Sequence, residues 1–179
     1  MIKTKPKRGG EPMYMEVCRD LLERTLAMNL KNSSIAAEIL YEPSFVSQGK
    51  TVYCQVRKQN SEMFICYEHF SRYDARLLKC TEISADFGDD FFTDNFCGIK
   101  LLDNDGQQSI EKRIDEISTI KCRKIKSSLG LDGYSHTVVI NGRSFFWWCE
   151  PVSNNAKLLN EPVSAVFSFL PEDLRRTEQ

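Results

Sequence analysis

The sequence has few of the residues on which common active sites depend. It holds only two histidines, His69 and His136, and no two of its seven cysteines have Cys-x-x-Cys spacing. This scarcity speaks against a zinc site, because zinc usually takes four cysteine or histidine ligands at short spacings. The sequence also lacks a phosphate-cradling glycine loop, a Gly-x-Ser-x-Gly turn and a dinucleotide-binding fingerprint. We therefore predict no metal, no cofactor and no catalytic residues.

Long apolar runs and an excess of one charge are missing as well. No apolar stretch approaches the length of a membrane span, and no apolar segment follows the basic N-terminus as it would in a secretion signal. The formal net charge of −1 gives the whole molecule no general attraction to nucleic acid or to a membrane. An odd number of cysteines favours free thiols in a reducing compartment. Together these features predict a cytoplasmic protein.

The local structure is best specified over residues 134–149. Two strand-like runs are joined there by Asn141 and Gly142, which best tolerate the positive φ values of a type I′ hairpin turn. The turn sets the register and places His136 opposite Trp147 on the more apolar face, which we assign to the core. Trp148 must then lie on the other face, so it is either covered by a helix or left for a partner.

The remaining elements follow from apolar periodicity. Helices are expected over residues 12–30 and 107–129, with a last helical region over 156–170 that Pro162 interrupts. Strands are expected over 35–41, 51–57, 62–70 and 96–102, with a second hairpin at 59–61. Residues 71–83 fit a helix or a strand. The sequence thus predicts a single α+β domain over 12–171, between a basic flexible tail (1–11) and a charged tail (172–179). Its mainly antiparallel sheet has two β-hairpins and is packed by two longer helices and a C-terminal helical segment.

The composition of residues 85–96 indicates a partner-binding surface, because four aspartates alternate there with four phenylalanines. Carboxylates steer a basic partner, and phenylalanines supply the desolvated area that anchors it. The same segment also fits a solvated loop that its phenylalanines hold to the core. The residues that we select as partner-binding candidates are Asp86, Asp89, Asp90, Phe91, Phe92, Asp94 and Trp148.

Two other classes of function stay open. A small cytoplasmic hydrolase would use a thiolate and a base, for which Cys66 with His69 is the first candidate and Cys149 with His136 the second. It would otherwise use the aspartate cluster. A regulatory nucleic-acid-associated module would use the basic tail, although a solvated terminus explains that tail more simply. Residues 103–106 match part of a calcium loop but lack its other ligands, so we interpret them as a turn that ends a strand.

The C-terminal third carries a family resemblance. Its order is Leu131-Asp132-Gly133, a strand, the aromatic strand 143–148, Pro151 and a leucine-bearing terminal helix. In this order it resembles small bacterial proteins of the immunity type, which neutralise a toxin delivered between neighbouring cells. The resemblance implies a cytoplasmic α+β protein that has no catalytic activity and binds a basic toxin domain one to one. Neither the toxin nor the oligomeric state follows from the sequence.

Overall fold

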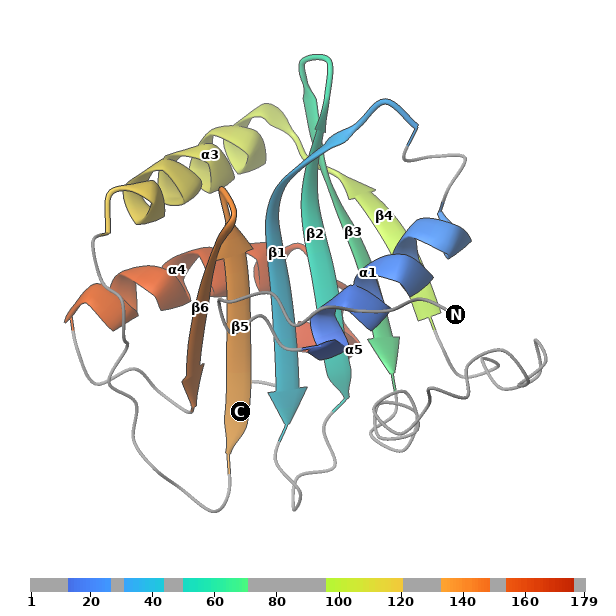
Figure 1. The fold of residues 1–179 in the computed structure, drawn as a ribbon. Coiled ribbons are helices and arrows are strands. Elements are labelled where there is room, and N and C mark those ends of the chain that lie inside the picture. Colours follow the sequence, from blue (N-terminus) through green and yellow to red (C-terminus); the bar gives the residue numbers. More distant parts are fainter. Residues whose placement is uncertain are drawn as a thin grey trace.

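A computed structural model describes residues 13–26, 31–43, 50–70, 96–120, 133–148 and 154–175. Its centre is one six-stranded antiparallel sheet in the order β4-β3-β2-β1-β5-β6, with helices on both faces (Figure 1). The strands are β1 (Ser34–Pro43), β2 (Thr51–Gln59), β3 (Glu62–Phe70), β4 (Phe96–Leu101), β5 (Tyr134–Ile140) and β6 (Arg143–Trp148). The helices are α1 (Met13–Thr25), α3 (Asn104–Ser118), α4 (Asn154–Ser168) and α5 (Glu172–Arg175). The predicted α+β class is confirmed.

Both predicted hairpins form, and their turns take the backbone conformation that the sequence requires. Asn141 and Gly142 have φ values of 52° and 71°, and Asn60 in the β2–β3 turn has a φ of 55°. Positive φ at both central residues of the β5–β6 turn matches type I′, whose twist follows that of the strands. The predicted register is confirmed, because His136 lies opposite Trp147.

One face of the sheet, which we call the α3/α4 face, holds the larger core. Alternate residues of the strands point to this face and pack against α3, α4 and α5. Trp147 and Val138 are fully buried there, as the hairpin register predicted. Leu174 of α5 is fully buried as well. Residues 172–175 were assigned to the charged tail, but they form helix α5, and Leu174 packs in this core.

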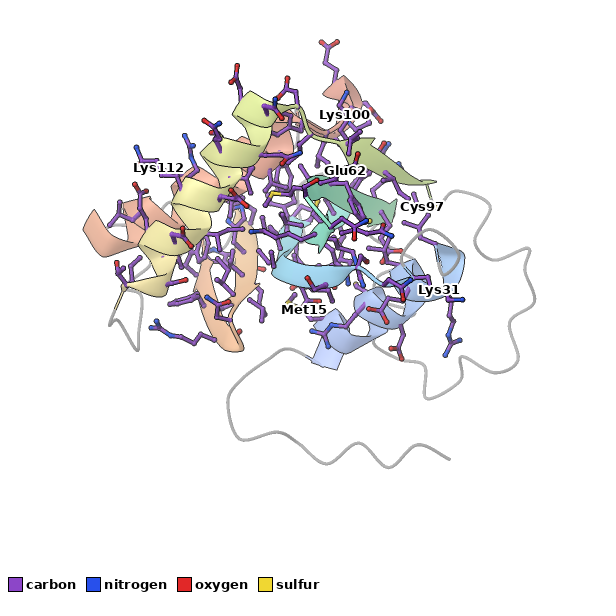
Figure 2. The ribbon with its side chains drawn as sticks, turned by 90° about the horizontal axis from the view of Figure 1, so that it is seen from above. Met15, Lys31, Glu62, Cys97, Lys100 and Lys112 are labelled. Carbon is purple, nitrogen blue, oxygen red and sulfur yellow. The ribbon has the colours of Figure 1, made fainter. Side chains whose placement is uncertain are left out.

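The opposite face, which we call the α1 face, holds a smaller core. Met15, Cys18 and Leu22 of α1 are fully buried against Leu40, Tyr53, Phe64 and Cys66 of the strands. Figure 2 views the molecule from above, with Met15 of α1 and Lys112 of α3 on opposite sides of the strands. The α1 face thus has only one described helix against it.

Two predicted helix boundaries are wrong. The helix expected over 107–129 begins at Asn104, because the Asp103 side chain accepts a hydrogen bond from the Gly106 amide at 2.8 Å and caps the first turn. It ends at Ser118, where the Thr119 hydroxyl donates a hydrogen bond to the Glu116 carbonyl. Residues 121–129 of the expected helix lie outside the described residues. Residues 103–106 are therefore a helix start and not the turn that we expected.

Pro162 does not divide the C-terminal helix, contrary to the prediction. Residues Asn154–Ser168 form one helix with Pro162 inside it. An internal proline costs about 3 kcal/mol. Leu159, Val163, Val166 and Phe167 are at most 2% exposed in this helix. Burying each such side chain is worth about 1.5–3 kcal/mol, so tertiary packing outweighs the local cost.

Candidate partner-binding surface

The predicted partner-binding residues divide into two groups. Asp86, Asp89, Asp90, Phe91, Phe92 and Asp94 lie outside the described residues, as does the ambiguous segment 71–83. Trp148 is described and lies at the end of β6, on the α1 face, where it is half-buried. The surface around Trp148 is therefore the described part of the candidate site.

Phe146 extends this surface along β6. Its side chain points to the same face as Trp148 because the two residues are two positions apart on a strand. Phe146 is 52% exposed, although phenylalanine is among the residue types most often buried. The strand neighbours are smaller and polar, with Ser135 opposite Trp148 and Thr137 opposite Phe146. The exposed Phe146 ring and the Trp148 side chain therefore lie beside the buried hydroxyl side chains of the neighbouring strand.

Two polar atoms of this surface have unsatisfied hydrogen-bonding capacity within the described part of the chain. The Trp148 Nε1 and Thr137 Oγ1 atoms are buried, and neither has a hydrogen-bond partner there. Thr137 as a whole is 1% exposed. A buried donor without an acceptor costs about 1–3 kcal/mol. Both atoms are shielded from solvent, so a ligand that binds on this surface does not reach them.

Trp147 offers nothing to a partner, because it is fully buried on the α3/α4 face. Its ring stacks on His136 with centroids 5.0 Å apart and an interplanar angle of 22°. Tyr41 and Tyr134 also contact the imidazole, at 5.3 and 5.2 Å. Burial among these rings lowers the pKa of His136 from 6.5 to about 4. The side chain is therefore a neutral core histidine at physiological pH.

A buried polar network fixes α1 to the centre of its face. Arg19 donates to both carboxylate oxygens of Glu38, at 2.7 and 2.8 Å, and the Tyr53 hydroxyl donates to the same carboxylate. Burial, with Glu38 beside it, raises the pKa of Tyr53. The network continues to Gln55, whose amide donates to the Tyr53 oxygen, and to Arg57, which donates to the Gln55 carbonyl. Its groups satisfy one another, so we assign it to the positioning of α1.

The sequence prediction did not find this network. The available signal was the set of polar residues at alternate positions of predicted strands, namely Glu38, Gln55 and Arg57. Such residues on an otherwise apolar strand indicate a polar partner element above the sheet. The prediction also did not select Phe146, although its register placed it beside Trp148.

The thiol–histidine alternative does not assemble in the structure. Cys66 is fully buried under α1, whereas His69, three residues along the same strand, points to the α3/α4 face. Burial raises the pKa of the Cys66 thiol to about 12, and an activated thiolate requires the opposite shift. Cys149, the partner considered for His136, lies outside the described residues. The described cysteines 18, 54, 66 and 97 are all free thiols.

Glu68 is the most perturbed carboxyl group described. It lies on the α1 face of β3, opposite Tyr53 and Cys97, and is 4% exposed. Burial raises its pKa well above the ordinary value. Within the described residues its Oε1 atom has no hydrogen-bond partner. This carboxyl group is therefore protonated over a pH range in which an exposed glutamate is charged.

The described residues hold neither a cluster of metal-ligand side chains nor a helix that could span a membrane. Among them, no three histidine, cysteine, aspartate or glutamate side chains come together as metal ligands do. Asp103, the first residue of the partial calcium-loop match, uses its side chain as the α3 cap. None of the described helices combines the length and the apolar character needed to cross a membrane.

Comparison with known proteins adds no further assignment. A scan against protein-family models, a search of curated proteins and a search of solved structures each found no match for this chain.

Proposed function

We propose that this chain is a non-enzymatic protein-binding protein, and specifically an immunity-type protein that captures and neutralises a basic toxin domain in the cytoplasm. The observation that carries the proposal is the exposed Phe146 beside half-buried Trp148 on edge strand β6. Large aromatic residues dominate the binding free energy of protein interfaces when a partner encloses them.

Attraction of a basic toxin would come from the acidic segment. Arg143 is the single charged residue of β5 and β6 in the described structure, so these strands provide anchorage without steering. Asp86, Asp89, Asp90 and Asp94 would provide the steering, and Phe91 and Phe92 would add anchor area. Toxins that cut nucleic acid need a basic surface to hold phosphate, which gives such carboxylates a complementary target.

The direct test is protection of cells that express the toxin domain encoded next to this chain's gene. The wild-type chain should protect, and Phe146→Ala combined with Trp148→Ala should weaken binding by about 2 kcal/mol or more, roughly 30-fold in Kd. Leu158→Ala is the matched control, because Leu158 is 39% exposed but lies on α4. A wild-type chain that does not protect, or a double variant that binds as tightly as the control, contradicts the proposal.

The acidic segment makes a separate kinetic prediction. Asp89→Asn with Asp90→Asn should slow association with the toxin and reduce its dependence on salt, because steering acts on the on-rate. Stopped-flow association at several ionic strengths measures both effects. An unchanged association rate at low salt would favour the alternative interpretation, in which the segment is a solvated loop.

A further inference from the structure

The second exposed apolar site lies at the opposite end of the sheet, on β4. Ile99 is 40% exposed and Leu101 is 56% exposed, and both point to the α1 face. Among the described residues, β4 pairs with β3 alone, and Figure 2 labels Cys97 and Lys100 on this strand. We infer that this edge pairs with β4 of a second copy of the chain, which joins two sheets into one. The inference is independent of the proposed function.

Backbone hydrogen bonding sets which β4 residues can form that pairing. The Leu102 amide donates to the Met63 carbonyl at 3.0 Å. In an antiparallel pair, bonded and non-bonded positions alternate, so this bond fixes the phase along the whole strand. Residues 96, 98 and 100 therefore bond to β3. The backbone groups of Cys97, Ile99 and Leu101 point outward, on the same three residues whose side chains point to the α1 face.

A second copy matches this edge in one register. A twofold axis through Ile99 pairs Ile99 with its own equivalent and Cys97 with Leu101 of the second copy, so apolar side chains meet on the α1 face. All three outward residues then bond, with up to about six backbone hydrogen bonds. On the other face, Lys100 lies opposite Gly98 of the second copy, where the Tyr67 ring occupies the place of a side chain. An axis through Lys100 would instead oppose two ammonium groups, which is unfavourable.

The same register explains how the edge tolerates exposed leucine and isoleucine. Sheet edges are commonly guarded against unwanted pairing by charged residues, and Lys100 is exposed on β4. In the Ile99-centred register Lys100 does not obstruct pairing, whereas it disfavours the neighbouring register centred on itself. One lysine therefore selects the register of the pairing instead of preventing it.

The contact is short, so the dimer should be weak and depend on concentration. The strand has six residues, from Phe96 to Leu101. Interfaces below about 1,200 Å² of total buried area are usually transient. The dimer keeps β6 at the two outer ends of the joined sheet, so each copy retains its Phe146 surface.

Sedimentation velocity on the full chain, from low to high micromolar concentration, tests the inference. The wild-type chain should shift from monomer toward dimer, and Ile99→Lys should abolish the shift because it places two ammonium groups face to face. Phe146→Lys is the matched control: the same substitution at an exposed apolar residue of the other edge strand should leave the dimer intact. A wild-type chain that stays monomeric throughout overturns the inference, as does a dimer lost in Phe146→Lys and kept in Ile99→Lys.

A cross-linking variant tests the register without relying on loss of the dimer. Leu101→Cys places a new thiol opposite the native Cys97 of the second copy, at the strand separation that a disulfide can span. Mild oxidation should give a disulfide-linked dimer on a non-reducing gel, and adding Cys97→Ser should remove it. Lys100→Cys, which points to the other face and lies opposite Gly98, should not cross-link in this way. Cross-linking that is independent of Cys97, or equal for the two cysteine variants, refutes the register.

Discussion

Replacing His136 with phenylalanine should change how the stability of this protein depends on pH. The folded chain holds the imidazole with a pKa lowered to about 4, whereas the unfolded chain titrates near the ordinary value of 6.5. Above pH 6.5 the histidine is neutral in both states. As the pH falls from 6.5 to about 4, the unfolded chain takes up a proton that the folded chain does not, so stability is lost.

The size of this loss follows from the two pKa values. At about 1.4 kcal/mol per pKa unit, the difference amounts to about 3 kcal/mol between pH 6.5 and 4. His136 is 1% exposed, so solvent screening reduces this value little. The phenylalanine ring of His136→Phe keeps the stacking position over Trp147, 5.0 Å away in the wild type, and cannot be protonated.

Urea denaturation of both proteins between about pH 7.5 and pH 4, followed by circular dichroism, gives the required difference. Carboxyl groups and His69 contribute equally to both curves and cancel when one is subtracted from the other. The variant should gain about 3 kcal/mol relative to the wild type over this range. A constant difference across the range would refute the assignment of His136 as a buried neutral histidine.

Three further predictions concern the packing. Glu68→Gln should be more stable than the wild type at neutral pH, because the raised pKa of Glu68 makes ionisation of the buried carboxyl group costly. The difference in the free energy of unfolding should grow as the pH rises, and a variant less stable than the wild type at about pH 8 contradicts the prediction. Trp147→Ala should cost about 3–5 kcal/mol and Phe146→Ala less than about 1 kcal/mol; equal losses in thermal denaturation would place both rings in the core. Arg143 donates to the main-chain carbonyls of Ser118 and Ile120 at the end of α3, so Arg143→Met should cost about 1 kcal/mol of stability. Amide hydrogen exchange in the last turn of α3 should become faster, and unchanged exchange would exclude this capping role.

The hairpins were predictable because their information is local. Asn141 and Gly142 specify the turn, and the turn determines which residues face each other, so the burial of Trp147 and His136 followed from the sequence. The C-terminal end of α3 was not predictable in the same way. The residues that hold it, Asn141 and Arg143, are more than twenty positions away in sequence.

The continuity of α4 through Pro162 had the same origin as the early end of α3. A proline gives a strong local signal to end a helix, but the four buried side chains that oppose it depend on a sheet that the local pattern does not contain. The Arg19–Glu38 ion pair likewise joins a helix and a strand: the polar strand residues indicated a polar partner, but no local pattern identified α1 as that partner. The features that apolar periodicity predicted wrongly or did not predict are therefore those that tertiary contacts determine.

Unequal cover of the two sheet faces connects the fold to both proposed interactions. The α3/α4 face buries Trp147 and His136 beneath helices, so these rings stabilise the fold and are not accessible to a partner. On the α1 face the described core gathers around the centre of the sheet, where the Arg19–Glu38 pair fixes α1. Apolar side chains at both ends of that face stay exposed, namely Phe146 on β6 and Ile99 with Leu101 on β4. Edge strands also carry the backbone groups that a sheet leaves unpaired. The one described helix on this face lies closest to β3, and apolar side chains stay exposed on both edge strands, where the two proposed contacts, one aromatic and one aliphatic, would form.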